Sequence, residues 1–357
     1  MSRFDQLKTL GYDARREEEL HTRWPDADPA RVIAQHGKSY VVTAAPGEMK
    51  AEVSGRFRHR TTTAAELPVV GDWVAYSGVD DGSLGIIDGV LTRTSTFSRK
   101  VAGVTSDEQV LAANIDFLFV VSSLTSDFNV RRIERYVTLA WEGGTTPVIV
   151  LTKIDLCDEV AGALAETASA APGVDIVAID ALHDEDLVDL DRYLSSNKTI
   201  ALVGSSGVGK STLINRLAGA DVMHTAELRD DGKGRHTTTY RRLIPLAGGG
   251  AVIDTPGMRE LQLWSTTDAV NTSFEDIALL AVDCRFSDCS HRHEPGCAVL
   301  DAVERGDLEA GRLASYDKQM REIAAFELRK NKRLAHQASR RSGRIGREAQ
   351  ARARHKR

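Results

Sequence analysis

Residues 204–212 read Gly204-Ser205-Ser206-Gly207-Val208-Gly209-Lys210-Ser211-Thr212. The apolar run 199–203 precedes them, and a helical pattern follows from Thr212 to Leu217. A strand, a glycine-rich turn and a helix in this order predict a phosphate-binding loop, because the glycines let successive backbone N–H groups point at phosphate oxygens. We expect the Lys210 ammonium to bridge the terminal phosphates and the Ser211 hydroxyl to coordinate Mg²⁺.

A second motif, Thr152-Lys153-Ile154-Asp155, ends the apolar run 147–151 and indicates which base is bound. Ligands of open α/β sheets bind at this carboxyl edge of the strands. Asp155 can accept hydrogen bonds from the ring N–H and the exocyclic amine of guanine, a pattern that adenine does not offer, while the stem of Lys153 packs along the base. After the run 175–179 comes Asp180-Ala181, where we expect the Ala181 N–H to meet the guanine oxygen.

Two segments after the phosphate loop are typical of switches that sense the γ-phosphate. In Asp254-Thr255-Pro256-Gly257 we expect Asp254 to hold Mg²⁺ through water and the Gly257 N–H to contact the γ-phosphate. In the polar segment 232–239 we expect Thr238 to close on Mg²⁺.

Catalysis lacks one common part. Met258 stands where a Ras-like enzyme has a glutamine that orients water, so we expect slow intrinsic hydrolysis and activation by a partner. His236, in the first switch, is a candidate catalytic residue, and an exposed loop histidine is the competing interpretation.

The order of these motifs is rearranged. In an ordinary small GTPase the base-reading motif comes last, whereas here it precedes both the phosphate loop and the switch at Asp254. This order predicts a circular permutation that leaves the sheet and the site intact. We expect the preceding domain to lead into the base-reading half, and the second switch to pass its nucleotide-dependent movement to the C-terminal domain.

Three of the four cysteines lie in the pattern Cys284-x4-Cys289-x-His291-x5-Cys297. Three thiolates and one imidazole suit a structural Zn²⁺ in closed tetrahedral geometry. Such clustering favours a metal over disulfides in a chain without secretory features. His293 is an alternative ligand, and free thiols beside a surface histidine are the competing interpretation.

Charge is distributed unevenly along the chain. Residues 329–357 hold twelve lysines and arginines against Glu348, a net +11, so that the rest carries −16 of the overall −5. A basic tail on an acidic body predicts a polyanionic partner, although a solvated terminus without a partner fits the same composition. Because the N-terminus has no apolar signal region and no long apolar run occurs, we expect a cytoplasmic protein that does not enter a membrane. We also expect a monomer.

Residues 30–105 are predicted to form a small closed β-barrel. Five short strand-like runs lie between turn signals, at 31–34, 39–43, 49–53, 72–76 and 85–91. Five strands suit an oligonucleotide-binding (OB) barrel, although an SH3-like unit without nucleic-acid function fits the same count. The run Arg56-Phe57-Arg58-His59-Arg60 is interpreted as a loop facing nucleic acid, because it mixes an aromatic ring with cations.

Between residues 106 and 265, apolar runs alternate with helical patterns, which predicts a doubly wound, mostly parallel sheet. The fold class is therefore α/β: a circularly permuted phosphate-loop GTPase domain between the OB-type barrel and a zinc-binding helical domain at 266–328. Residues 1–29 are predicted to be a charged lead-in that contributes poorly to a core, and 329–357 a basic tail.

These residues together resemble the circularly permuted bacterial GTPases called ribosome small-subunit-dependent GTPase A (RsgA/YjeQ). The resemblance covers about residues 30–325. It rests on the permuted order and on four segments: Gly71-Asp72-Trp73-Val74, Ala113-Asn114-Ile115-Asp116, Gly234-Arg235-His236-Thr237-Thr238-Thr239 and Cys284…Cys289-x-His291…Glu294-Pro295-Gly296-Cys297.

The resemblance implies an OB-type barrel, a central GTPase and a zinc-binding C-terminal domain. It also implies that the chain binds the small ribosomal subunit through rRNA, assists its late maturation and hydrolyses GTP faster when bound to it. His236 matches the family's switch histidine. Thr152 departs from the family's usual Asn, which would tie the base to the phosphate loop, so we expect a somewhat weaker nucleotide affinity, although other GTPases use threonine.

Three functions fit the sequence. The leading hypothesis is a GTPase stimulated by the small ribosomal subunit. In the second, the chain is a GTP-dependent RNA-binding module and hydrolysis is incidental. In the third, it is a general nucleic-acid-binding protein that uses barrel, cysteine cluster and tail on any polyanion. A nucleotide-dependent difference in subunit binding is the most informative measurement.

Overall fold

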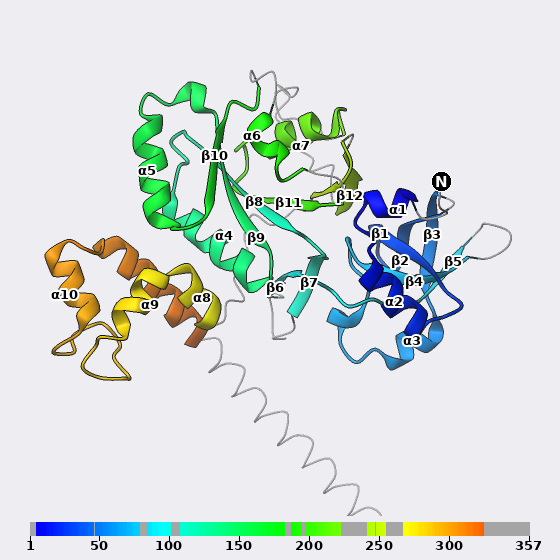
Figure 1. Cartoon of the computed structure of the whole chain (residues 1–357), viewed down its shortest axis with the longest axis horizontal. Coiled ribbons are helices and arrows are strands. Elements are labelled where there is room, and N and C mark those ends of the chain that lie inside the picture. Colours follow the sequence, from blue (N-terminus) through cyan, green and yellow to red (C-terminus); the bar gives the residue numbers. More distant parts are fainter. Residues whose placement is uncertain are drawn as a thin grey trace, which may run out of the picture. The chain divides into compact units, whose positions relative to one another are not determined.

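The computed structural model describes residues 5–45, 47–78, 84–100, 108–182, 187–194, 197–222, 241–246, 248–254 and 267–324. They belong to two compact units, residues 1–264 and 265–357. The first unit holds a barrel and an α/β sheet, and the second holds helices (Figure 1). The cysteine cluster also belongs to the second unit. Among the described residues no helix has the length and apolar character needed to cross a membrane.

Five strands form the barrel: β1 (Asp28–His36), β2 (Ser39–Ala44), β3 (Gly47–Val53), β4 (Trp73–Ser77) and β5 (Gly85–Val90). They run in the order β1-β2-β3-β5-β4, and β4 pairs back onto β1, which closes the barrel. Every pair is antiparallel except β3 with β5. Val32, Val42, Val74 and Ile87 fill the interior without exposure, because alternate residues of each strand point inward. The predicted five-stranded barrel is confirmed.

The cationic run interpreted as a loop is instead part of a short helix, α3 (Gly55–Arg60). The Ser54 hydroxyl caps it by accepting a hydrogen bond from the Phe57 N–H at 3.1 Å. Phe57 packs on the barrel core, and the cations around it are exposed. The loop prediction is wrong because six residues are too few to show a helical period.

The α/β sheet has the strand order β10 (Asp175–Ile179), β9 (Thr146–Thr152), β8 (Phe117–Ser123), β11 (Thr199–Val203), β13 (Ala251–Asp254) and β12 (Arg242–Pro245). The first five strands are parallel, and only β12 is antiparallel to its neighbour. The predicted doubly wound, mostly parallel sheet is confirmed.

Helices cover both faces of this sheet. Side chains of α4 (Val130–Glu142) and α5 (Val160–Ala170) pack on the face that contains Leu118, Ile149 and Ala201. Side chains of α6 (Val188–Asp191) and α7 (Lys210–Ala218) pack on the opposite face, against Phe119, Val148 and Ile200. Consecutive strand residues thus enter different cores, which is why the strands read as continuous apolar runs. Four further elements were not predicted: the antiparallel strands β6 (Thr96–Lys100) and β7 (Glu108–Ala113), and the 3₁₀ turns η1 (Ala64–Glu66) and η2 (Ile154–Leu156).

The N-terminal segment is not the poorly packed lead-in that was predicted. It forms α1 (Asp5–Thr9) and α2 (Ala14–Arg23), and Leu7, Leu10 and Leu20 are at most 4% exposed within the main core. The prediction is wrong because the apolar residues are few and the many charged ones between them obscure the amphipathic spacing. Residues 5–29 therefore contribute to the core that joins the barrel to the sheet.

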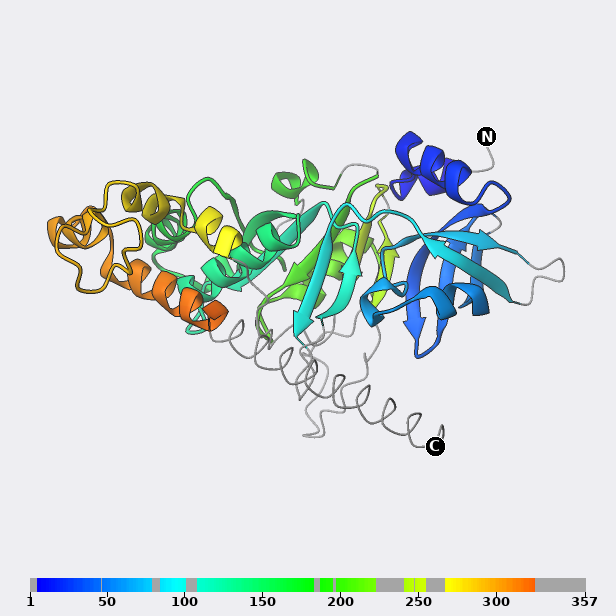
Figure 2. The ribbon, with the colours of Figure 1, turned by 90° about the horizontal axis from the view of Figure 1, so that it is seen from below.

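Barrel and sheet are joined by backbone pairing. β1 pairs antiparallel with β12 at Ala34 and Arg242, so the strands form one sheet of eleven (Figure 2). β12 comes directly after the segment predicted as the first switch, so the barrel contacts the strand that leaves that switch.

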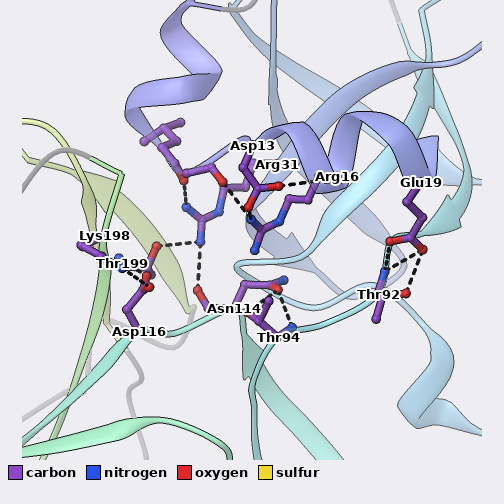
Figure 3. Close-up of polar contacts among 12 residues, drawn as sticks. Asp13, Arg16, Glu19, Arg31, Thr92, Thr94, Asn114, Asp116, Lys198 and Thr199 are labelled. Carbon is purple, nitrogen blue, oxygen red and sulfur yellow. Dashed lines mark hydrogen bonds and ion pairs between the residues drawn. The ribbon is translucent and has the colours of Figure 1, made fainter. Parts of the chain in front are cut away.

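A buried arginine completes this joint (Figure 3). Arg31, on β1, is 1% exposed; its guanidinium donates to the carbonyl oxygens of Leu10, Gly71 and Asn114 and to the Thr199 hydroxyl at 2.8 Å. All four acceptors are neutral, and burial lowers the pKa of Arg31 to about 9. The cation is therefore held by oriented dipoles from the N-terminal segment, the barrel and the α/β sheet.

The two segments Gly71-Asp72-Trp73-Val74 and Ala113-Asn114-Ile115-Asp116 meet beside this arginine. The Asn114 amide donates to the Gly71 carbonyl at 3.1 Å, and the Asp116 carboxylate accepts from Lys198 Nζ at 3.0 Å and from the Thr199 N–H at 2.8 Å. Gly71 has φ +92°, and a Cβ there would lie 2.1 Å from the Ala113 carbonyl oxygen. The close approach of the two segments therefore requires glycine.

The second unit contains α8 (Thr267–Ser273), α9 (Glu275–Ala281), α10 (Ala298–Arg305) and helical residues 310–324. Val270, Phe274, Ile277 and Val299 form its core without exposure. Arg312, 3% exposed, donates to both oxygens of Asp276, at 2.5 and 2.7 Å, and its guanidinium lies 4.7 Å from the centre of the Phe274 ring. A common core and the ion pair between buried Arg312 and half-buried Asp276 thus hold these helices together.

Candidate functional site

The predicted phosphate loop connects β11 to α7. Gly204, Gly207 and Gly209 all have positive φ, at +148°, +79° and +93°. A Cβ at Gly204 would lie 2.2 Å from the Val121 carbonyl oxygen, so the loop can pass β8 only with glycine there. The loop ends at the N-terminus of α7, where unpaired N–H groups and the positive end of the helix favour anions.

Lys210, the first residue of α7, is held under this loop. Its ammonium donates to the Gly204 carbonyl at 2.8 Å and to the Ser205 carbonyl. Ser211 follows in the same first turn and is half-buried, as is Thr212. The Lys210 charge is therefore placed among the backbone groups of Gly204–Gly209.

The base-reading motif comes at the end of β9, which pairs with β8, and β8 in turn pairs with β11, the strand that leads into the phosphate loop. Thr152 is fully buried, and its hydroxyl donates to the Val208 carbonyl of the phosphate loop at 2.7 Å. Lys153 has φ +58°, in the left-handed region that non-glycine residues rarely adopt. Asp155, in η2, is exposed and can accept hydrogen bonds from a ligand. Thr152 thus links the base-reading motif to the phosphate loop at the position where the family usually has asparagine.

The companion loop follows β10. The Asp180 carboxylate accepts a hydrogen bond from the Leu182 N–H at 2.9 Å, which closes a tight turn around Ala181. The Ala181 carbonyl accepts from Arg216 Nη1 at 3.2 Å, which ties this turn to α7. The Ala181 N–H and the phosphate loop are therefore positioned by the same helix.

The motifs meet at one edge of the sheet. β9, β10, β11 and β13 are all members of the parallel set, so their carboxyl ends, which carry Thr152, Asp180, Gly204 and Asp254, lie on the same side. His236, Thr238 and Gly257, predicted for the switches, lie outside the described residues.

One residue of this edge was missed from the sequence. Arg132, in the first turn of α4, donates from Nη1 to Asp127 Oδ2 at 2.7 Å and to the Ser205 hydroxyl of the phosphate loop. The hydrogen bond from Arg132 lowers the pKa of Asp127, with the positive charge of Lys210 adding to the effect. Arg132 and Ser205 are 73 positions apart in the sequence, so no local sequence pattern could predict their contact.

In the second unit, the structure brings together the predicted ligands Cys284, Cys289, His291 and Cys297. Their ligand atoms all lie within 4.8 Å of one another. Cys284 Sγ is 3.8 Å from Cys297 Sγ, and His291 Nδ1 is 3.6 and 3.4 Å from these two sulfurs. A tetrahedral Zn²⁺ with bonds of about 2.3 Å to sulfur and about 2.0 Å to nitrogen requires edges of roughly 3.5–3.8 Å, and the three distances among Cys284, His291 and Cys297 are close to that range. His293 is exposed and is not among the four.

The loop between the ligands is shaped by Glu294. Its carboxylate accepts hydrogen bonds from the Ser290 hydroxyl and from the backbone N–H groups of Ser290, Arg292 and His293. These bonds hold the pKa of Glu294 well below its ordinary value. They close a turn in which His291 has φ +56°, and the imidazole Nδ1 thereby faces the sulfurs.

Comparison with known proteins identifies relatives of the whole arrangement. Residues 90–264 match the family model described as RsgA GTPase, and residues 199–332 match one described as 50S ribosome-binding GTPase. Small ribosomal subunit biogenesis GTPase RsgA 2 of Lactiplantibacillus plantarum is 47% identical over 82% of this chain and 83% of its own length. The RsgA protein of Opitutus terrae is 46% identical over 83% of each chain.

Solved structures agree. YjeQ from Thermotoga maritima has a TM-score of 0.62 at 26% identity, covering 83% of this chain and 98% of its own. YloQ, described as a circularly permuted GTPase, has the same TM-score and identity, covering 85% and 98%. The likeness thus extends over barrel, sheet and C-terminal helices.

Proposed function

The chain belongs to the RsgA family of circularly permuted GTPases, and from this premise we propose that it hydrolyses GTP while bound to the small ribosomal subunit. It assists late maturation of that subunit in the cytoplasm, as a monomer that contacts rRNA. The names of its relatives support the choice of partner, since they are small ribosomal subunit biogenesis GTPases.

The observation that carries the nucleotide assignment is the bond between Thr152 and the Val208 carbonyl at 2.7 Å. It couples the base-reading motif to the phosphate loop although the two are 56 residues apart. We propose that Asp155 reads the guanine edge, with Lys153 along the base and the Ala181 N–H at the guanine oxygen. A nucleotide that bridges both motifs then binds with its base and phosphates held by one hydrogen-bonded frame.

For hydrolysis we propose that Ser211 and Thr238 coordinate Mg²⁺, with Asp254 acting through water and the Gly257 N–H on the γ-phosphate. The metal would neutralise charge on the phosphate oxygens. The loop residues Gly204–Thr212 supply N–H groups and the Lys210 charge. His236 is proposed as the catalytic residue, because Met258 cannot orient water.

Contact with rRNA is proposed for the barrel and the basic tail. Arg56, Arg58 and Arg60 are exposed on α3, with His59 beside them, and the +11 charge of residues 329–357 would attract phosphates. Zn²⁺ bound by Cys284, Cys289, His291 and Cys297 has a structural role, because all four positions of the tetrahedron are taken by protein ligands.

The test is phosphate release from GTP by the full chain alone, with isolated small subunits, and with large subunits as the control. We expect slow release alone and much faster release with small subunits only. Equal rates in all three reactions would overturn the proposal.

The alternative, a GTP-dependent binding module with incidental hydrolysis, is tested by His236→Ala. If hydrolysis drives the function, this variant binds subunits but blocks their release and maturation. His21→Ala is the control, because this exposed histidine of α2 has, among the described residues, a hydrogen bond to the Glu17 carbonyl alone. Normal maturation by a hydrolysis-deficient His236→Ala chain would favour the alternative.

A further inference from the structure

Arg132 lies beside the phosphate loop without belonging to any nucleotide motif. Asn129 caps the helix by accepting a hydrogen bond from the Arg132 N–H at 3.1 Å, and this cap places Arg132 in the first turn of α4. From there its guanidinium reaches the Ser205 hydroxyl and Asp127. The arginine therefore comes to the loop from a different helix than Lys210 does.

Two cations converge on Ser205. The Lys210 ammonium contacts the Ser205 carbonyl, and the Arg132 guanidinium contacts the Ser205 hydroxyl. Asp127 is the carboxylate that they share, since both lower its pKa. Arg132 and Lys210 thus place two positive charges at one residue of the phosphate loop, where an anion is expected.

The Arg132 side chain also has donors in reserve. Both of its side-chain contacts use Nη1, so that among the described residues Nε and Nη2 make no hydrogen bond, and the side chain is 35% exposed. A guanidinium with free N–H groups in a planar fork suits phosphate oxygens better than an ammonium does. Asp127, 43% exposed, competes for the same cation.

We propose that Arg132 is a nucleotide-binding residue that contacts the terminal phosphate of GTP and so favours GTP over GDP. A loop lysine of this kind reaches the β- and γ-phosphates. Lys210 and Arg132 both contact Ser205. Ser205 therefore lies next to the phosphates that Lys210 reaches, and Arg132 lies beside it. When GTP is bound, the Arg132 guanidinium exchanges its contact with Asp127 for one with the γ-phosphate. GDP has no γ-phosphate, so in its complex the guanidinium stays with Asp127. The inference rests on the proposed phosphate-binding role of Gly204–Thr212.

The test compares the affinities of the full chain for a fluorescent, slowly hydrolysed GTP analogue and for fluorescent GDP, with Mg²⁺ and without ribosomes. For Arg132→Ala we expect the preference for the GTP analogue over GDP to fall about tenfold, the size of one lost charge-assisted hydrogen bond. Arg132→Lys retains the positive charge, so the preference for the GTP analogue should fall less in this variant than in Arg132→Ala.

Asp127→Asn provides a change of opposite sign. Removal of the competing carboxylate should raise the preference for the GTP analogue about threefold, as expected for one charge removed near the surface. Arg192→Ala, at an arginine 59% exposed and near Asp175 at the far end of the sheet, should leave the preference unchanged.

If Arg132 only latches Ser205 in place, Arg132→Ala would weaken both nucleotides equally, and this result would overturn the proposal, as would no change at all. Lys210→Ala tests the loop separately. Loss of both nucleotides in Lys210→Ala together with an unchanged preference in Arg132→Ala would reject the role of Arg132 while leaving the phosphate loop in place.

Discussion

Thr152 shows how a single side chain can replace another with different chemistry. The family's usual asparagine at this position was expected to be the better tether, yet the buried threonine hydroxyl donates to the Val208 carbonyl at 2.7 Å. A shorter side chain suffices because the phosphate loop passes close to Thr152: a Cβ built at Gly209 would lie in van der Waals contact with the Thr152 hydroxyl oxygen, at 3.7 Å. This hydrogen bond therefore opposes the loss of nucleotide affinity that was expected from the missing asparagine.

Replacing Thr152 by Val keeps the shape of the side chain and removes the hydroxyl. The buried Val208 carbonyl then loses its donor, so we expect the free energy of unfolding to fall by about 1–3 kcal/mol. GTP and GDP should also bind more weakly, because the phosphate loop loses its link to β9. Denaturant unfolding and nucleotide titration measure the two effects. Thr152→Ser, which retains the hydroxyl, is the control, and an equal loss in both variants would contradict this account.

At the scale of elements, short polar contacts decide where helices attach. The Glu19 carboxylate, on α2, accepts hydrogen bonds from the Thr92 N–H and hydroxyl at 2.9–3.0 Å and from Arg23 Nη1 at 2.5 Å. Partial burial alone would raise the pKa of Glu19, but the bonds from Thr92 and Arg23 outweigh it and hold the pKa below the ordinary 4.5. α2 is thereby fastened to the loop that follows the barrel.

This contact predicts a pH dependence. A carboxyl group whose pKa is lower in the folded chain stabilises the fold above its unfolded pKa, and that stability disappears as the pH falls through the folded value. We therefore expect the wild-type chain to be more stable than Glu19→Gln at neutral pH, with the difference shrinking as the pH falls below 4.5. Urea unfolding across this range measures it, and a difference that stays constant would show that Glu19 acts by packing instead.

Arg31 gives a second prediction at this scale. Arg31→Leu would leave three buried carbonyl oxygens and the Thr199 hydroxyl without this donor, so we expect the free energy of unfolding to fall by about 3 kcal/mol or more. Arg242→Ala is the control, since that side chain is 62% exposed and lies 3.9 Å from Glu48. Its cost should be below about 1 kcal/mol. Equal costs for the two variants would contradict the role of Arg31 as a buried joint.

At the scale of the whole molecule, the two compact units have different sources of stability. Residues 1–264 share a large core that runs from the N-terminal helices through the barrel and the sheet. Residues 267–324 have a small core in which Cys297 is 1% exposed, with Cys284 and Cys289 packed against it. Because so small a core buries little apolar surface, we propose that a metal at the cysteine cluster is needed to stabilise it.

Removal of zinc should therefore unfold the second unit alone. We expect one Zn²⁺ per chain, and after chelation a loss of helical circular dichroism while nucleotide binding by the first unit persists. Cys297→Ser should bind zinc weakly, whereas Cys157→Ser, at a cysteine outside the cluster, should keep it. Full zinc content in Cys297→Ser would show that the cluster is not the binding site.

Chemistry that depends on neighbouring residues could be read from the sequence. The phosphate loop, Thr152–Asp155 and the cysteine pattern are local, since each needs a fixed spacing of glycine, lysine, carboxylate or sulfur. Strands 175–179 and 199–203 were predicted at their observed bounds, because apolar runs with flanking turns are also local.

Only tertiary structure decided the rest. Arg132 reaches Ser205 across 73 residues, Arg31 reaches Thr199 across 168, and β1 joins β12 by backbone pairing that no side-chain pattern specifies. The order of the motifs indicated that the barrel leads into the base-reading half. Pairing of β1 with β12 also attaches the barrel to the strand that follows the predicted first switch. This pairing is possible because an edge strand presents unpaired backbone N–H and C=O groups that can bind any strand that the fold places beside it.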